Sequence, residues 1–253
     1  MTLVWRPGFQ FDADASTYIE AVEAADTQAL ETGVRYAIND FVIGCKNDGI
    51  WDAIKASCIL AGARTLDGAL VPLVGTAPTN FNFVSGDYNR ETGLKGNGSN
   101  KYLDSNRAND ADPQDSNHNA LYVSETASTG RLLNSGENGS ESGTNTIAAT
   151  PAKFNVRNRS STTLLNIGNN VNNSFVAMNR STSSAIEFRS AGTTTTHTLL
   201  SSTPTSEPIT LYYGNGIYTD PRLAFYSIGE SLDLAALDTR VSNLITAIGA
   251  AIP

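Results

Sequence analysis

Residues 175–200 read FVAMNRSTSSAIEFRSAGTTTTHTLL, and this stretch decides the fold. Two short apolar runs begin at Phe175 and Ala185, and a threonine-rich run ends at Leu200. Ser, Asn and Gly, which favour turns, separate the runs. Strands of about five residues with turn signals about every 8–12 residues are typical of an antiparallel sandwich or barrel. The stretch therefore predicts antiparallel β-structure.

The same pattern extends over residues 80–226. Phe81 and Phe83 alternate with asparagine, and Phe154 and Val156 alternate with other polar residues. This period of two is the pattern of a strand that buries one face. We therefore expect the body of the chain to be mainly β, as an antiparallel β-sandwich over residues 79–230.

Helical periodicity brackets this β region. Asp14 is expected to cap a helix over residues 15–22, and apolar stripes predict further helices over residues 30–45 and 50–59. A stripe over residues 234–248 predicts a C-terminal helix. We divide the chain into an extended N-terminal segment (1–13), a helical region (14–78), the β-sandwich (79–230) and the C-terminal helix (231–253).

The chain is acidic, with 17 Lys+Arg against 25 Asp+Glu and a formal net charge of −8. A nucleic-acid binder needs clustered cations, and here the cations are dispersed, so we expect no nucleic-acid partner. No apolar run approaches the roughly 20 residues that span a bilayer, so we expect no membrane insertion. The start of the chain lacks the pattern of a secretory signal. Cys45 and Cys58 are expected to be buried thiols in a helical core, in a protein folded in a reducing cytoplasm.

Neither histidine has the surroundings of a catalytic or metal-binding residue. His118 and His197 lie among polar residues, with no His or Cys at metal-ligand spacing. The Gly-x-Ser-x-Gly motif of a nucleophile elbow does not occur in the sequence. We expect both histidines to be solvated and the protein not to be an enzyme.

An acidic cluster is the most site-like feature of the sequence. Asp104, Asp110, Asp112 and Asp115 are interleaved with asparagine, and Ca²⁺ prefers several carboxylate and amide oxygens that converge on one point. The spacing departs from the EF-hand loop, which has a glycine at its sixth position and a glutamate at its end. The alternative is an Asn/Asp-rich turn whose side chains bond their own backbone. Calcium is the one cofactor considered, with these four aspartates as its candidate ligands.

Aromatic side chains offer a second kind of binding site. Rings stack on sugar faces, and they lose little conformational entropy on binding. The alternative in a β-sandwich is a half-buried tyrosine with its hydroxyl pointing outward. The candidates for stacking on a sugar are Tyr88, Tyr102, Tyr122, Tyr212, Tyr213 and Tyr218.

Longer segments of the chain are similar to one protein family. The segments are LAGARTL (60–66), ALVPLVG (69–75), NFVSGDYNR (82–90), KYLDSNR (101–107) and FYSIGESLDL (225–234). They resemble a family of virion structural proteins of tailed bacteriophages, notably those of cyanobacterial and marine hosts. The likeness covers most of the chain from about residue 14 onward.

The resemblance implies a short helical region followed by a concanavalin A-like, laminin G-like jelly roll. It also implies a place on the virion, as a tail fibre or baseplate appendage whose N-terminal region attaches to the particle. The jelly roll would then face the host surface, with a surface glycan as the candidate ligand. Other virion proteins and further copies of the chain, in a homotrimer assembled in the host cytoplasm, are the implied partners. No binding residue is carried over, because no binding motif of the family is matched.

Three aromatic residues ahead of the first predicted helix are candidates for docking to the particle. Trp5, Phe9 and Phe11 lie in a segment that is predicted to be extended, with Pro7 and Gly8 between the first two. Large apolar side chains in such a segment are exposed unless another subunit covers them. The alternative is that they fold back on their own domain.

Two other interpretations of the protein stay open. One keeps the virion but makes the chain a capsid decoration or head-fibre protein. The other is a tailspike enzyme that degrades polysaccharide, which needs two carboxyl groups on either side of the scissile bond. No such pair is marked out, and the sequence lacks the internal repeat of a β-helical tailspike.

Overall fold

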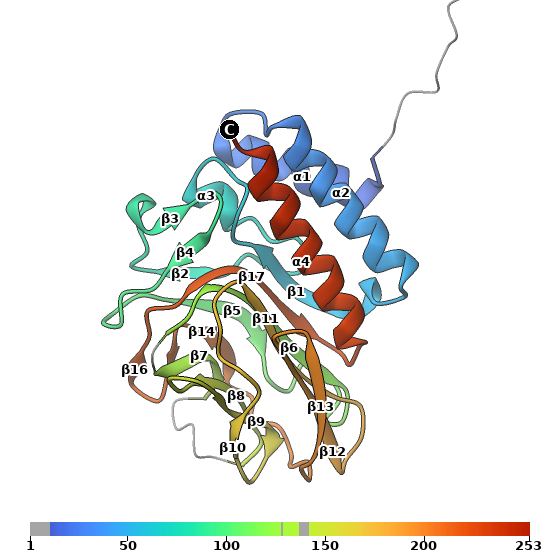
Figure 1. The fold of residues 1–253 in the computed structure, drawn as a ribbon, viewed down its shortest axis with the longest axis vertical. Helices are drawn as coiled ribbons and strands as arrows, with labels where there is room; N and C mark the ends of the chain where they lie inside the picture. The colour runs from blue at the N-terminus through green and yellow to red at the C-terminus, as the bar shows by residue number, and fades with distance from the viewer. Residues whose placement is uncertain (1–10, 128, 137–141) are drawn as a thin grey trace, which may run out of the picture.

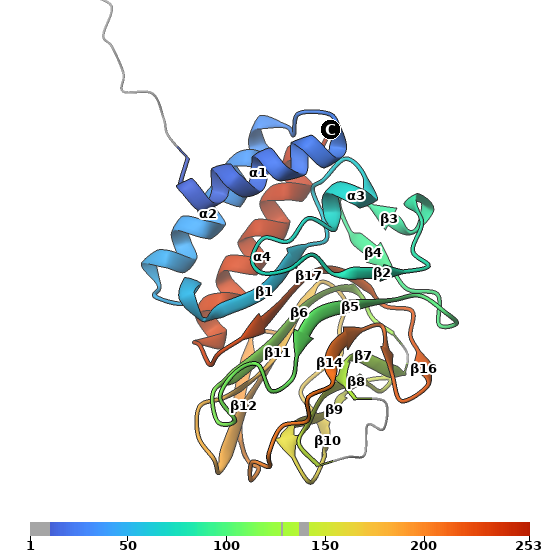
Figure 2. The same cartoon turned by 180° about the vertical axis from the view of Figure 1, so that it is seen from behind.

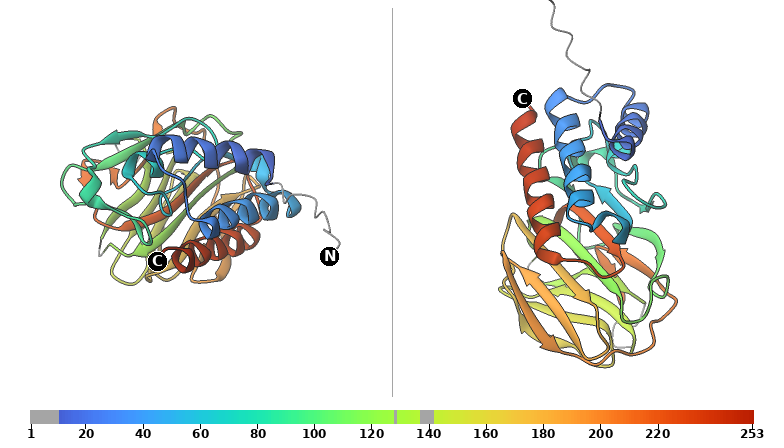
Figure 3. Two further views of the ribbon diagram at one scale, coloured as in Figure 1. Left: turned by 90° about the horizontal axis from the view of Figure 1, so that it is seen from above. Right: turned by 90° about the vertical axis from the view of Figure 1, so that its right-hand side faces the viewer.

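The computed structural model describes residues 11–127, 129–136 and 142–253 of the 253-residue chain. Two antiparallel sheets lie face to face, and a layer of helices covers the outer face of one of them (Figure 1). Views from behind and from above show the helices on the same side of the sandwich (Figure 2, Figure 3). The fold is therefore mainly β, a jelly-roll-type antiparallel sandwich with helices before and after it, as the sequence predicts.

Within the described residues the larger sheet has eight strands and the smaller sheet has seven. In spatial order the larger sheet contains β13 (Thr193–Thr198), β12 (Ala185–Ser190), β11 (Ser174–Arg180), β6 (Asn117–Glu125), β17 (Arg222–Gly229), β4 (Gly93–Lys95) and β3 (Tyr88–Asn89), and β1 (Ile54–Ile59) also pairs with β17. The smaller sheet contains β10 (Leu164–Ile167), β9 (Phe154–Ser160), β8 (Thr144–Ala149), β7 (Gly130–Ser135), β14 (Pro208–Leu211), β5 (Tyr102–Ala108) and β2 (Thr79–Phe81). A separate hairpin joins β15 (Tyr213–Gly214) to β16 (Ile217–Tyr218).

The larger sheet is buried on both faces, and the alternation along β6 explains how. Leu121 and Val123 belong to the apolar core between the two sheets. Ala120 and Tyr122 point the other way, into the core between this sheet and the helices. A strand that is covered on both sides is apolar on both sides, whereas a strand with one wet face is not. The smaller sheet therefore offers the outer face that no helix of the described chain covers.

The helical layer consists of α1 (Ala13–Asp26), α2 (Thr32–Asn47), α4 (Leu234–Ala251) and the short α3 (Leu66–Ala69). Asp12, and not the predicted Asp14, caps α1, because its Oδ1 accepts from the Asp14 amide at 3.0 Å. Lys46 of α2 holds the same Oδ1 at 2.7 Å, which fixes Asp12 at the start of the helix. Asp233 caps α4 by accepting from the amides of Ala235 and Ala236. No helix in the described ranges is long and apolar enough to cross a bilayer.

The helix predicted over residues 50–59 is wrong. A single 3₁₀ turn at Trp51–Ala53 leads into β1, which pairs with β17. A short apolar run is compatible with a helix and with a strand that is buried on both faces. Here the pairing with β17 makes the segment a strand. Cys58 consequently lies in the core between the sheets and not in a helical core, although Cys45 and Cys58 are both buried free thiols as predicted. The region predicted as helical therefore contributes one strand to the sandwich.

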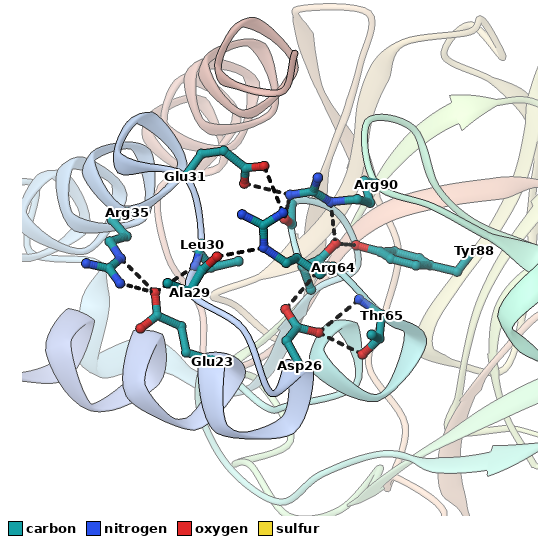
Figure 4. Close-up of polar contacts among 12 residues, drawn as sticks. Glu23, Asp26, Ala29, Leu30, Glu31, Arg35, Arg64, Thr65, Tyr88 and Arg90 are labelled. Atoms are coloured by element: carbon teal, nitrogen blue, oxygen red, sulfur yellow. Dashed lines mark hydrogen bonds and ion pairs between the residues drawn. The ribbon is translucent and has the colours of Figure 1, made fainter.

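Ion pairs and hydrogen bonds fix the helical layer to the sandwich (Figure 4). Glu31, the residue before α2, pairs with Arg64 at 3.2 Å and with Arg90 at 2.6 Å. Asp26, at the end of α1, accepts from the amides of Arg64 and Thr65 at 2.7 and 2.9 Å. Burial raises the pKa of the Glu31 carboxyl, but the hydrogen bond and charge of Arg90, with Arg64, outweigh it and leave that pKa lowered. The ion pairs of Glu31 therefore hold best when its carboxyl is ionised.

A candidate binding site of aromatic and acidic side chains

An aromatic cluster of Phe81, Tyr102, Tyr213 and Tyr218 lies on the outer face of the smaller sheet. Along β5 the buried Leu103 points into the core between the sheets, so Tyr102 and Asp104 on either side of it point outward. Phe81 of β2 lies directly opposite Tyr102 in the strand register. Their rings are stacked, with centroids 4.1 Å apart and planes within 4° of parallel. The register of two adjacent strands therefore builds the first half of the cluster.

The hairpin of β15 and β16 supplies the other half of the aromatic cluster. Tyr213 and Tyr218 are paired across it, with ring centroids 4.7 Å apart. The Tyr213 ring lies 5.1 Å from that of Tyr102, so the two halves are in contact. Between β14 and the hairpin, Tyr212 has a φ of +68° and is fully buried, and its hydroxyl donates to the carbonyl of Leu94 at 2.8 Å. The left-handed backbone conformation costs free energy at an aromatic residue, but it lets the Tyr212 side chain enter the core while that of Tyr213 faces outward.

A hollow of about 140 Å³ opens beside the cluster, and we call it the tyrosine hollow. It is lined by Tyr102, Asp104, Gly136, Glu207, Pro208, Thr210 and Tyr213. Ligand sites for drug-sized molecules are usually about 300–1,000 Å³, so this one suits a single ring or the end of a longer chain. Two aromatic faces, two carboxylates and a hydroxyl converge on it.

The surroundings of Tyr102 favour its neutral phenol. Burial raises the pKa of Tyr102, and the neighbouring Tyr218, Asp104 and Tyr213 raise it further. Asp104 accepts a hydrogen bond from the amide of Asn106 at 2.8 Å through Oδ1. Glu207 is exposed, while its main-chain carbonyl accepts from the amide of Asn109 at 2.9 Å. The hollow thus presents the carboxyl groups of Asp104 and Glu207 beside the neutral ring of Tyr102.

The structure brings together three of the six candidate tyrosines. Tyr102, Tyr213 and Tyr218 share the aromatic cluster. Tyr88 instead donates to the carbonyl of Ala63 at 2.8 Å, within the network of Figure 4. The remaining two, Tyr122 and Tyr212, are buried in the cores on either side of the larger sheet. Sequence reasoning missed Phe81 as a cluster member, although its alternation with asparagine marked the strand that carries it.

The four aspartates proposed as calcium ligands lie in different surroundings. Asp104 lines the tyrosine hollow on β5, whereas Asp110, Asp112 and Asp115 lie in the loop that follows β5. Asp112 forms an ion pair with Arg107 and its side chain is only 3% exposed. In the part of the chain that the structure describes, no three His, Cys, Asp or Glu side chains are grouped so as to hold a metal ion. Calcium binding stays a prediction without a matching ligand set among these residues.

A guanidinium occupies the inner side of the same loop. Arg159 of β9 is 1% exposed, and it donates to the main-chain carbonyls of Asp112 and Pro113 at 3.1 and 2.5 Å and to that of Asn109. Burial lowers the pKa of Arg159 to about 10, so it stays charged at neutral pH. The carbonyl oxygens of this Asp- and Asn-rich loop therefore converge on an internal cation.

The expectation of a solvated His118 is wrong. Its side chain is fully buried on β6, with Nδ1 2.6 Å from the carbonyl oxygen of Glu230 and Nε2 2.7 Å from the hydroxyl of Ser227. Burial lowers the pKa of His118 to about 4. Because Ser227 is also fully buried, this Ser–His pair has no access to a substrate and is structural. His197 lies half-buried on the exposed strand β13, with Nε2 2.8 Å from the hydroxyl of Thr195.

Two of the three residues proposed to dock to a particle, Trp5 and Phe9, lie outside the described residues. Phe11 is described, and its ring contacts that of Tyr36 on α2 edge-on, with centroids 5.4 Å apart. At Phe11 the chain thus packs on its own helical layer.

Larger hollows of about 420 Å³ lie in the helical layer. One lies between α2 and α4, where Arg240 donates to both carboxylate oxygens of Asp48 at 2.7 and 2.8 Å. The other lies beneath α1, against Trp51. Arg240 beside the first hollow is engaged in an internal pair. Tyr18 and Trp51 line the second hollow, but Tyr18 is only 5% exposed. Neither hollow therefore offers two exposed aromatic faces. We therefore place the candidate site at the tyrosine hollow.

Comparison with known proteins supports the fold. No family model and no curated protein matches the sequence. Among solved structures, the binding domain of botulinum neurotoxin serotype D is similar, with a TM-score of 0.51 at 11% identity over 76% of this chain and 51% of that one. The receptor-binding domain of the C/D mosaic serotype gives a TM-score of 0.53 at 12% identity over 76% and 51%. A further structure of the serotype D receptor-binding domain gives 0.52 at 10% identity over 76% and 52%.

The chain thus spans about half the length of the structures that it matches. At this level of identity the likeness establishes a shared jelly-roll sandwich.

Proposed function

We propose that this protein is a carbohydrate-recognition component of a bacteriophage virion. In this account the jelly roll displays the tyrosine hollow to a glycan on the host surface, and the helical layer attaches the subunit to the particle. The observation that carries the recognition role is the gathering of aromatic rings and free carboxylates around one hollow. The virion setting rests on the resemblance of the segments between residues 60 and 234.

The chemistry of the hollow suits a sugar. A sugar ring has apolar C–H faces that pack on aromatic rings, and Tyr102 and Tyr213 offer such faces at the rim. Its hydroxyl groups are donors for the carboxylates of Asp104 and Glu207 and for the hydroxyl of Thr210. Tyrosine also provides contact area at low entropic cost. Each side chain of the hollow therefore has a counterpart on a saccharide.

The similar solved structures add a second line of support. They are described as binding or receptor-binding domains of botulinum neurotoxins. We carry a recognition role, and not catalysis, over to this chain as part of the proposal. Release of reducing sugar from host envelope polysaccharide by the purified chain would contradict it.

On the particle, we place the subunit in a tail fibre or baseplate appendage and propose that it assembles as a homotrimer through its helical layer. An antiparallel pair of helices, α2 and α4, forms one side of that layer, with Ile43 and Tyr36 exposed on α2. The position of the subunit on an imaged particle distinguishes the tail from the capsid. The molar mass of the purified chain in solution tests whether it forms a trimer.

The substitution Tyr213→Ala tests the recognition role. It removes a half-exposed ring from the hollow, so we expect host polysaccharide to bind about tenfold more weakly, the equivalent of about 1.4 kcal/mol. Isothermal titration calorimetry with envelope polysaccharide measures the change. The control is Leu200→Ala, which removes a highly exposed apolar side chain that does not line the hollow and should leave the affinity unchanged. Equal affinities for wild type and Tyr213→Ala would contradict the proposal.

A further inference from the structure

We propose that the tyrosine hollow selects sugars by charge, so that an amino sugar binds best and an acidic sugar is rejected. This inference rests on the proposed function and names the class of sugar that the site takes. It is carried by two carboxylates, Asp104 and Glu207, that share the hollow with the rings of Tyr102 and Tyr213.

The fold holds both carboxylates at the hollow. Asp104 lies between Thr79 and Thr210 in the strand register, on the outward face of β5. Its hydrogen bond from the Asn106 amide keeps one oxygen in place. The side chain of Glu207 runs over Gly136, with Cγ 3.7 Å from the position that a Cβ would take there. Both acids are therefore part of the lining of the hollow.

Neither carboxylate has a cationic partner within the described ranges. The ion pairs found there involve other acids. Arg107, on the same strand as Asp104, is committed to Asp112. Arg131 lies behind the hairpin, where it donates to the carbonyl of Gly214 at 3.0 Å, and it does not line the hollow. The hollow thus carries negative charge that no cation of the described residues neutralises, so this charge acts on any bound ligand.

The charge of the hollow predicts the order of affinity among sugars of different charge. An ammonium group is attracted both to carboxylates and to the faces of tyrosine rings. A neutral sugar keeps the ring stacking and the hydroxyl-to-carboxylate hydrogen bonds but lacks this attraction. A carboxylated sugar brings a like charge, and the net charge of −8 on the chain adds to the repulsion. Salt weakens all of these charge effects, because the Debye length falls from about 10 Å at 0.1 M to about 3 Å at 1 M.

The test compares three probes that share one ring and differ in charge: glucosamine, glucose and glucuronic acid. We titrate each into the full chain at low and at high salt and follow the amide resonances by NMR. We expect glucosamine to bind about fivefold more tightly than glucose, and glucuronic acid about fivefold more weakly. At 1 M salt the three affinities should converge.

A double variant assigns the ranking to the two carboxylates. In Asp104→Asn with Glu207→Gln the shape and the acceptor for the Asn106 amide are kept, so the differences among the three probes should disappear. Glucose itself should bind somewhat more weakly, because neutral amide oxygens replace its carboxylate acceptors. The control is Glu91→Gln, an exposed acid in the turn between β3 and β4, which should keep the wild-type ranking. Equal affinities for all three probes in the wild type, or an unchanged ranking in the double variant, would overturn the charge selection and leave sugar binding intact. Failure of every probe and of host polysaccharide to bind would defeat the proposed function itself.

Discussion

The imidazole of His118 is held in one tautomer. A main-chain carbonyl only accepts, so Nδ1–H must donate to Glu230, and Nε2 must then accept from the hydroxyl of Ser227. Protonation of Nε2 would reverse that second hydrogen bond, so that the Ser227 hydroxyl loses its acceptor, and would place a charge in the core. The pKa of about 4 follows mainly from burial, with the nearby Arg107 lowering it further and Asp112 and the bond to Glu230 opposing it. His118 therefore stabilises the fold in its neutral form.

This gives the stability a pH dependence with a definite sign. The ordinary pKa of histidine, about 6.5, describes the unfolded chain, and in the fold the pKa is lowered to about 4. The contribution of neutral His118 is thus complete above about pH 6.5 and is lost as the pH falls from there towards 4, by up to about 3 kcal/mol. Urea unfolding at pH 7, 5.5 and 4.5 measures the loss.

An NMR titration of the imidazole resonances is the direct check on this prediction. His118 should stay neutral down to about pH 4, and the His197→Asn variant identifies its signal. A titration midpoint near 6.5 for His118, or an unfolding free energy that is flat between pH 7 and 4.5, would contradict the account. Acids with lowered pKa values, such as Glu31, act at lower pH and so leave this window to the histidine.

The sequence places His118 in solvent because its neighbours in residues 115–119 are aspartate, serine and asparagine. Its partners lie 109 and 112 residues away, on and just after β17. A strand of polar residues is buried only where a distant strand supplies hydrogen bonds, and composition does not reveal that. Sequence could predict that β6 is a strand, but not which of its polar residues would find partners.

At the scale of elements, the loop after β5 depends on Arg159. Its guanidinium donates to carbonyls of the loop and is almost wholly shielded from water. Arg159→Met keeps the length of the side chain but leaves those carbonyls without a donor, so we expect a loss of about 3–5 kcal/mol in the free energy of unfolding. Urea unfolding measures it. Arg35→Met, which removes a partly exposed guanidinium paired with Glu23, is the matched control and should cost about 1 kcal/mol or less.

The same element tests the calcium prediction. If Arg159 is the cation of the loop, replacing EDTA by calcium should leave the melting temperature of the wild type unchanged. A rise in melting temperature with calcium would show that a metal stabilises the fold, and a small effect of Arg159→Met would show that the guanidinium does not order the loop.

The candidate site shows what element-level patterns can and cannot predict. The sequence marks three tyrosines of the cluster as separate candidates for stacking on a sugar: Tyr102, Tyr213 and Tyr218. The alternation of Phe81 with asparagine predicts the strand that carries Phe81. Their convergence depends on the register of β2 with β5 and on the left-handed turn at Tyr212, and neither is encoded in local periodicity. The mistaken helix over residues 50–59 has a related cause, because the pairing of β1 with β17 decided its structure.

At the scale of the whole molecule, the helices and the hollow lie on different faces. The helical layer covers the larger sheet, and the tyrosine hollow opens on the outer face of the smaller one. The acidic, weakly charged composition fits this arrangement, because a surface rich in neutral hydrogen-bonding groups suits the recognition of sugars. In the proposed function, the subunit attaches to the particle through the helical face and binds a glycan through the other.

The most direct test of this account maps where a host glycan touches the chain. We propose recording amide and aromatic NMR spectra of the full chain while envelope oligosaccharide from the host is added. The account predicts shifts at Phe81, Tyr102, Tyr213 and Tyr218 and at the amides of Asp104 and Glu207, with the helical layer unaffected. Shifts confined to the helical layer, or no shifts at saturating oligosaccharide, would contradict it.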